Sequence, residues 1–264
     1  MIGKTHNAMK YYQFSLWPQL KHGIFTRKGG VSQGPWGALN TGGTVGDDVE
    51  AVRHNHELMY EALSVNRSRA STVWQVHGAD VVVVDGPVRG RRWIALADGM
   101  ITDQPDTPLV MRYADCTPIM LYDPVKGVIG VAHAGWRGTV IGAASSTVRA
   151  MMKAYGCRPG DIQAGIGPSI GPERYQVGEE VVEAALRHFG TLNGGLAEGP
   201  LIRRDPADGT AYFNLWSANK LDLQSAGVDQ IEVAEICTAL HTDEFYSHRA
   251  EKGNTGRFGA VISL

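Results

Sequence analysis

The sequence has few cysteines, no long apolar run and almost no net charge, and each of these absences excludes a class of protein. Three cysteines in 264 residues do not form a disulfide framework, so we expect a reducing compartment, the cytoplasm. The N-terminal segment lacks the apolar core of a signal peptide, and no stretch reaches the roughly 18 to 20 apolar residues that span a bilayer. Lys and Arg number 25 against 27 Asp and Glu, a formal charge of −2. We therefore expect neither a nucleic-acid nor a membrane partner.

The usual nucleotide-binding loops are also missing. No glycine pair leads into the Gly-Lys-Ser/Thr of a Walker loop. The stretch 165–171 is similar to a dinucleotide loop, but Ile170 occupies the third glycine position and Pro168 removes a backbone donor. An ordinary nucleotide-phosphate cradle is therefore not predicted.

Glycine is abundant instead, with 33 residues, which indicates many tight turns. Short β-rich runs outnumber helical patterns, and they cover residues 72–76, 80–85, 107–114, 117–122, 127–132, 230–236 and 257–264. Helical apolar spacing predicts helices over residues 48–63, 139–155, 178–189 and 214–225. No change in composition divides the chain. We therefore expect one α+β domain over residues 1–264.

Two local features refine this prediction. Asp47 is expected to begin the first helix, because Glu50 follows it at the spacing of a capping box. The Gly- and Pro-rich segment 190–212 is expected to be an exposed excursion. On the first helix, His54 and His56 are two residues apart and point to different faces, so we expect a solvated surface there rather than a ligand pair.

Two histidines and a cysteine lie where apolar runs end next to glycines. His77, Cys116 and His133 are separated by 39 and 17 residues, which matches no local ligand motif. Imidazole and thiolate are good zinc ligands, and a catalytic zinc site has three protein ligands and an open position. The same residues also fit hydrogen-bonded histidines beside a buried thiol. A third interpretation makes Cys116 a nucleophile with a histidine base, oriented by Asp98 or Asp115.

Three arginines next to glycines or polar turns are candidate anion ligands. Arg27 precedes Gly29 and Gly30, which provide free backbone N–H groups. Arg249 and Arg257 occupy comparable positions near the C-terminus. A guanidinium binds phosphate or carboxylate through two parallel hydrogen bonds. We predict that at least one of the three contacts an anionic ligand.

Taken together, these segments resemble a known family. It is described as multicopper polyphenol oxidases or laccase-like proteins, the YfiH/YlmD group, with the mammalian laccase-domain protein FAMIN as a relative. The matching segments are Thr26–Ser32, Gly46–Asp48, Gln75–Gly78, Ala97–Gly99, Ala114–Cys116, His133–Gly138, Ile166–Pro172 and Thr255–Arg257. They extend over nearly the whole chain, and the His133–Gly138 motif with the upstream His and Cys is specific in combination.

The resemblance implies a four-layer αββα sandwich related to the deamidating toxin CNF. It also implies one zinc-type site at His77, Cys116 and His133, which would be both metal ligands and catalytic residues. Members of the family are described as enzymes of purine nucleosides, which phosphorolyse adenosine, inosine and methylthioadenosine or deaminate adenosine. Others are described as copper oxidases of phenols or as a cytoplasmic amidase that edits peptidoglycan precursors. Thr44, where relatives have His, and Glu173-Arg174, where some have Cys-Cys, depart from the pattern for additional copper sites.

The residues favour one of these activities over the others. A multicopper oxidase needs many histidines, and this chain has nine, of which the pair His54/His56 lies on a predicted helix surface. One metal, zinc or alternatively copper, suits purine nucleoside phosphorolysis, with Arg27, Arg249 and Arg257 as phosphate ligands. The expected partners are thus a purine nucleoside and phosphate, and no protein partner is indicated. The amidase is the chief alternative, and a zinc-stabilised binding module would require a fourth ligand that the sequence does not indicate.

Overall fold

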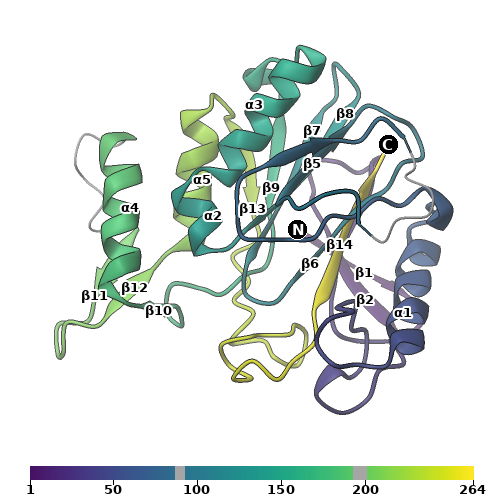
Figure 1. Cartoon of the computed structure of the whole chain (residues 1–264), viewed down its shortest axis with the longest axis horizontal. Helices are drawn as coiled ribbons and strands as arrows, with labels where there is room; N and C mark the ends of the chain where they lie inside the picture. Colours follow the sequence, from purple (N-terminus) through teal and green to yellow (C-terminus); the bar gives the residue numbers. More distant parts are fainter. Residues whose placement is uncertain (87–92, 193–200) are drawn as a thin grey trace.

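The computed structural model describes residues 1–86, 93–192 and 201–264, which form three β-sheets and five α-helices (Figure 1). The first sheet has five antiparallel strands, in the order β1 (Ile2–His6), β2 (Met9–Gln13), β3 (Lys21–Phe25), β14 (Phe258–Ser263) and β6 (Leu109–Tyr113). The C-terminal strand is therefore an inner strand of this sheet, between β3 and β6.

The second sheet has six strands and contains most of the predicted β-rich runs. Its order is β13 (Gln230–Val233), β9 (Gln163–Ile166), β7 (Thr117–Asp123), β8 (Val128–Ala134), β5 (Gly99–Thr102) and β4 (Val81–Val83). The pairs β13–β9 and β4–β5 are parallel, and the others are antiparallel. A third sheet joins β10 (Gln176–Val177), β12 (Ala211–Phe213) and β11 (Ile202–Arg204).

The core residues show how the layers stack. Successive side chains of a strand point to opposite faces. In β14, Phe258 and Ile262 enter a core shared with Met120 of β7, whereas Val261 faces Met59 of α1 (Val49–Ala62). The two larger sheets thus pack face to face, and α1 covers the outer face of the first sheet.

The outer face of the second sheet is covered in the same way. Ile119 and Leu121 of β7 share a core with Val148 and Met151 of α3 (Ala143–Tyr155) and with Leu223 of α5 (Leu215–Ser225). The remaining helices are α2 (Trp136–Val140) and α4 (Glu179–Leu192). In Figure 1, α4 and the small third sheet lie at one end of the molecule, away from α1.

The structure confirms the mixed α+β prediction and corrects its details. The predicted strand 72–76 forms only an isolated bridge at Trp74, and the predicted helix 139–155 is divided, because Gly142 adopts a positive φ between α2 and α3. The first helix begins one residue later than predicted, with Asp48 rather than Asp47 accepting a hydrogen bond from the backbone N–H of Ala51.

The predicted excursion 190–212 is also corrected where it is described. Residues 193–200 lie outside the described residues, but β11 and β12 belong to the segment, and Ile202 and Ala211 are buried. Within the described ranges no helix is both long and apolar enough to cross a membrane.

Candidate metal-binding site

Two of the three candidate ligands are brought together by one β-hairpin. Cys116 immediately precedes β7 and His133 lies near the end of β8, where Pro118 is its cross-strand partner. His77 comes from the loop before β4 and adopts a positive φ of 62°. The ligand atoms of the three side chains all lie within 4.8 Å of one another, and the two imidazole rings are 4.9 Å apart between centroids. The fold thus gathers the three predicted residues into one group.

Asp98, immediately before β5, holds this group in place. Its carboxylate accepts a hydrogen bond from Nδ1 of His133 at 2.8 Å and others from the backbone N–H groups of Val76, His77 and Gly78 at 3.1, 3.0 and 2.7 Å. Burial alone would raise the pKa of the Asp98 carboxyl, but the bond from His133 and those from the backbone keep that pKa below its ordinary value. One buried carboxylate therefore fixes both the ring of His133 and the loop of His77.

Because Nδ1 of His133 faces Asp98, Nε2 is the nitrogen left to face the other ligands. Hydrogen bonding of a metal-binding histidine to a carboxylate sets its tautomer and increases its basicity. Asp98 and Asp115 were both proposed as orienting residues, and the geometry assigns that role to Asp98. Asp115 instead accepts hydrogen bonds from Oγ1 of Thr238 and from the backbone N–H of Arg249, both at 2.7 Å.

The thiol and imidazole groups shift each other toward the charged state. Burial by itself would raise the pKa of Cys116, but the adjacent His133, with His77, lowers it to about 6. Burial would likewise lower the pKa of His133, but the Cys116 thiolate and Asp98 raise it to about 9. A thiolate at neutral pH is the form that binds metal. The thiolate is therefore ready to bind a metal, whereas His133 must release its proton to become a ligand, so metal binding is coupled to proton release.

The donor set fits a zinc-type ion. Two imidazole nitrogens and one thiolate are ligands of catalytic zinc sites, which keep a position open for substrate, and copper prefers the same atoms. The space around the three side chains is tight: a Cβ at Gly135 would lie 2.8 Å from Sγ of Cys116 and 3.1 Å from Cδ2 of His77. In residues 1–86, 93–192 and 201–264 this is the one group of three or more His, Cys, Asp or Glu side chains close enough to share an ion.

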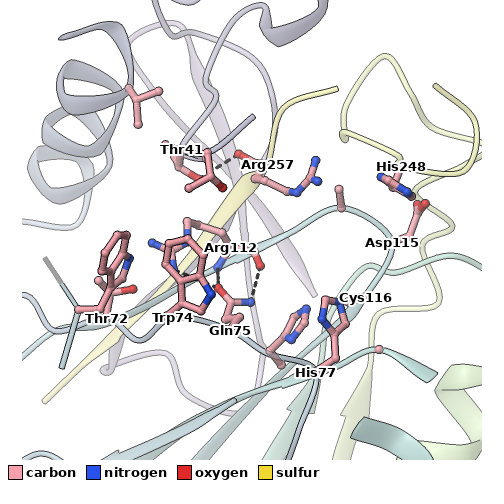
Figure 2. Close-up of a pocket in the computed structure, with 18 of the residues that line it drawn as sticks. Thr41, Thr72, Trp74, Gln75, His77, Arg112, Asp115, Cys116, His248 and Arg257 are labelled. Carbon is pink, nitrogen blue, oxygen red and sulfur yellow. Dashed lines mark hydrogen bonds between the residues drawn. The ribbon is translucent and has the colours of Figure 1, made fainter. Parts of the chain in front are cut away.

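The group lies in the wall of a cavity of about 800 Å³. Figure 2 shows His77 and Cys116 on one side of this pocket and Arg257 across from them. Its lining includes five arginines, namely Arg53, Arg112, Arg137, Arg249 and Arg257. A cavity of this size with a few convergent polar groups is typical of a small-molecule site.

Two of the three predicted anion ligands belong to this pocket. Arg249 donates to the carbonyl of Gln176 at 2.8 Å, and its guanidinium lies over the ring of Tyr175. Arg257 donates to the carbonyls of Thr255 and Gly256 at 3.2 and 2.8 Å. Burial lowers the pKa of the Arg257 guanidinium.

The structure places Arg27 outside this pocket. Its guanidinium forms an ion pair with Glu251 at 2.9 Å and donates to the carbonyls of Gly37 and Thr242, both at 2.9 Å. It also lies over the ring of Tyr246. The residue lines a separate hollow beside Lys28, so its charge is already compensated by a carboxylate within the protein.

Sequence reasoning missed several pocket residues. Arg137, in the His133–Gly138 motif, lines the pocket with its guanidinium over the ring of Trp136. The prediction of a solvated surface is correct for the exposed His54 but wrong for His56, which lines the pocket and hydrogen-bonds through Nε2 to the carbonyl of Thr41 at 3.0 Å. A hydrophobic pattern assigns helix faces only coarsely, and a polar residue turned toward a cavity does not differ in sequence from one facing bulk water.

Comparison of the chain with known proteins identifies its family. Residues 21–264 match the sequence family described as multi-copper polyphenol oxidoreductase laccase. The chain belongs to this family. It is 40% identical to the purine nucleoside phosphorylase YlmD of Geobacillus stearothermophilus, over 91% of this chain and 88% of that protein. It is 32% identical to the purine nucleoside phosphorylase YfiH of Escherichia coli K12, over 94% of this chain and 96% of that protein.

Solved structures give the same assignment. The crystal structure of YlmD from G. stearothermophilus superposes with a TM-score of 0.90 at 36% identity, over 98% of this chain and 97% of that one. The crystal structure of YfiH from Bacillus licheniformis superposes with a TM-score of 0.89 at 31% identity, over 99% of this chain and 98% of that one. The predicted membership of the YfiH/YlmD group is therefore confirmed.

Proposed function

We propose that this chain is a purine nucleoside phosphorylase that acts on adenosine, inosine and methylthioadenosine. In this reaction a phosphate oxygen forms a bond to the anomeric carbon of the sugar while the bond from that carbon to N9 of the purine breaks. The electron pair of the broken bond leaves with the base, which takes up a proton, and the sugar becomes a sugar 1-phosphate. Relatives named as purine nucleoside phosphorylases, at 40% and 32% identity, support this assignment.

The observation that carries the proposal is a set of guanidinium groups without a carboxylate partner beside the His–Cys–His group. The side chains of Arg249 and Arg257 donate to backbone carbonyls, and among the described residues the guanidinium of Arg137 has no ion pair. Arg27 differs, because Glu251 already neutralises it. A guanidinium in a pocket that forms no direct ion pair with a carboxylate is available to a dianionic phosphate. We therefore assign the phosphate to Arg249 and Arg257, with Arg137 beside them, rather than to Arg27.

His77, Cys116 and His133 are proposed to hold one zinc ion, with copper as an alternative. When bound, such an ion supplies Lewis-acid chemistry next to the substrate. The role of the protein is to hold the three ligands, to orient His133 through Asp98, and to seat phosphate against the sugar. Alignment of the two reactants accounts for much of the acceleration expected from such a site.

The proposal includes the architecture that the family resemblance implied. We interpret the order of α1, the first sheet, the second sheet and α3 with α5 as a four-layer αββα sandwich. The chain is proposed to be a single domain over residues 1–264. The pocket lies where loops of both sheets meet, since its lining includes Arg257 next to β14 and His133 of β8.

Adenosine deamination is the second candidate activity. The observation that favours it is a three-ligand group that faces a nucleoside-sized cavity, as in zinc deaminases. Deamination and the alternative amidase activity both consume water, whereas phosphorolysis consumes phosphate. Dependence on phosphate therefore separates the proposed function from both.

The test is to measure base release from adenosine and inosine over a range of phosphate concentrations. We expect saturation in phosphate and formation of ribose 1-phosphate. Arg249→Ala and Arg257→Ala each remove a charged contact worth about 2–3 kcal/mol, so kcat/KM for phosphate should fall roughly 30- to 150-fold with unchanged metal content. Arg203→Ala is the matched control, because Arg203 also lies over a tyrosine ring, that of Tyr212, but outside the pocket.

The absence of ribose 1-phosphate at every phosphate concentration, in protein that contains metal, would refute the proposal. Cleavage of a muramyl-amino acid amide by that same preparation would then establish the amidase instead. Inosine formation from adenosine without phosphate would show that deamination accompanies or replaces phosphorolysis.

A further inference from the structure

The pocket extends well beyond the His–Cys–His group. In Figure 2, Thr72 and Trp74 lie at one end, Asp115 and His248 lie at the other, and His77 and Cys116 are between them. Phosphate and metal account for the residues near Cys116. The end at Thr72 and Trp74 has a different chemistry, and the proposed function has so far assigned nothing to it.

This end presents aromatic surface to the cavity. Trp74 is 38% exposed, a large fraction for its size, and its ring packs edge-to-face against Trp93 with centroids 4.5 Å apart. The backbone N–H of Trp74 donates to the carbonyl of Ala95 at 2.9 Å, which fixes the strand-like segment on which the ring is mounted. A rigid, partly exposed indole in a cavity is a stacking surface for a planar ring, and nucleobases stack on such side chains irrespective of their identity.

Thr72 adds a polar group beside the two indoles. Thr72 lines the same end, and its Oγ1 is buried without a hydrogen-bond partner among the described residues. A buried hydroxyl left without a partner is unfavourable, and a ligand atom able to donate or accept a hydrogen bond would relieve this. A purely hydrocarbon group would stack on the indoles but leave the hydroxyl unpaired. The combination therefore favours a heteroaromatic ring with polar atoms at its edge.

We propose that Trp74, Trp93 and Thr72 form the subsite that binds the purine base of the nucleoside. The base stacks against the indoles with its edge toward Oγ1 of Thr72, and the sugar extends from there toward His77 and Cys116, where phosphate is held. This inference rests on the proposed function for the identity of the ligand. Trp74 and Thr72 would then determine affinity for the base without contributing to metal or phosphate binding.

Binding of free adenine, measured by calorimetry in the absence of phosphate, tests the subsite apart from any reaction. Base stacking on an aromatic side chain supports roughly a 5- to 150-fold effect, so Trp74→Ala should weaken adenine binding and raise KM for adenosine by that factor. Trp74→Phe should restore most of the loss. KM for phosphate and the metal content should not change, whereas a general loss of structure would alter both.

Thr72→Val provides a second variant that keeps the shape of the side chain. Loss of the hydroxyl should weaken adenine binding roughly 2- to 10-fold, and binding of benzimidazole, which lacks the polar six-membered ring, should change less. The control is Leu96→Ala: Leu96 pairs with Trp74 in a β-bridge and is 68% exposed, but it does not line the pocket. It should bind adenine like the parent protein.

The outcomes separate this inference from the phosphorylase proposal. If Trp74→Ala and Thr72→Val both bind adenine within twofold of the parent while phosphorolysis proceeds, the subsite is wrong and the proposed function stands. If adenine binding depends on Trp74 but no ribose 1-phosphate is formed, the subsite is upheld and the phosphorylase proposal fails. Parent protein that binds no purine at all overturns the subsite.

Discussion

Replacing Asp98 by Asn tests whether this one buried carboxylate organises the metal ligands. In the parent protein Oδ1 accepts hydrogen bonds from Nδ1 of His133 and the N–H of His77, and Oδ2 accepts from the N–H groups of Val76 and Gly78. A carboxamide has the same shape but only one oxygen. Whichever way it turns, its NH₂ group faces two donors, so two of the four hydrogen bonds are lost and the others lose their charge.

The size of the effect follows from these contacts. A hydrogen bond to a charged group contributes about 1.5–3 kcal/mol, so the loss of two predicts that the free energy of unfolding falls by about 3–6 kcal/mol. His133 also loses the carboxylate that increases its basicity. Replacing such a supporting group typically costs about 10- to 100-fold in metal affinity. We therefore expect weaker zinc binding in the Asp98→Asn protein even where it is fully folded.

Zinc affinity is measured by competition with a chelator of known affinity, and stability by urea unfolding of the metal-free protein. Asp123→Asn is the matched control. Asp123 is also fully buried and accepts backbone hydrogen bonds, from Val125 and Lys126 at 2.9 Å each, but it does not line the pocket. Because both of these bonds go to Oδ1, the amide oxygen of Asn can accept them, so this variant should keep its zinc affinity. Folded Asp98→Asn protein with the zinc affinity of the parent would refute the role given to Asp98.

The sequence predicts long apolar strands best, whereas the short buried strands β5 and β9, of four residues each, were missed. The apolar runs that became β6, β7, β8 and β14 were all identified, because nearly every side chain in them is buried. β1 (Ile2–His6) was missed, since four of its five residues are exposed and its sequence is largely polar. Its place in the sheet depends on pairing with β2, a contact that an alternation pattern cannot reveal.

The same kind of reasoning from the sequence explains only part of the metal-ligand group. The predicted β-rich runs 117–122 and 127–132 are neighbours in sequence, and the structure pairs them as a hairpin whose register places Pro118 opposite His133 and so brings Cys116 near His133. No comparable signal connects His77 to them, since its loop is held by Asp98 through contacts distant in sequence. His77 was a candidate because it lies next to a glycine where an apolar run ends, the family resemblance favoured it as a ligand, and the structure confirms that the three are together.

The local sequence does not reveal which of the three arginines is available to a ligand. Arg27 lies near glycines in the sequence, as anion-binding arginines do. Its charge is nevertheless neutralised by Glu251, which is 224 residues away. Arg249 and Arg257 have carbonyl partners instead, which no short motif distinguishes from a carboxylate partner. Whether a guanidinium is available to a ligand depends on tertiary contacts.

Two further predictions concern the walls of the pocket. Gly135→Ala would place a Cβ 2.8 Å from Sγ of Cys116, so zinc affinity should fall about tenfold, whereas Gly160→Ala, around which nothing lies within 4 Å, should leave it unchanged; equal affinities in both variants would contradict this. The last prediction is a pH dependence of stability that originates in His56. Burial and a nearby guanidinium lower the pKa of His56 from 6.5 to about 4. The hydrogen bond to the carbonyl of Thr41 acts in the opposite direction and is outweighed. Above pH 6.5 the ring is neutral in both the folded and the unfolded chain and has no effect on stability. Between pH 6.5 and 4 the unfolded chain binds a proton at this residue and the folded protein does not, so the free energy of unfolding falls by up to about 3 kcal/mol. His56→Gln, whose amide can still donate to the carbonyl of Thr41, should lack this loss. Urea unfolding of both proteins between pH 7 and 4 measures the difference, and stability profiles that remain parallel over that range would show that His56 titrates normally in the folded protein.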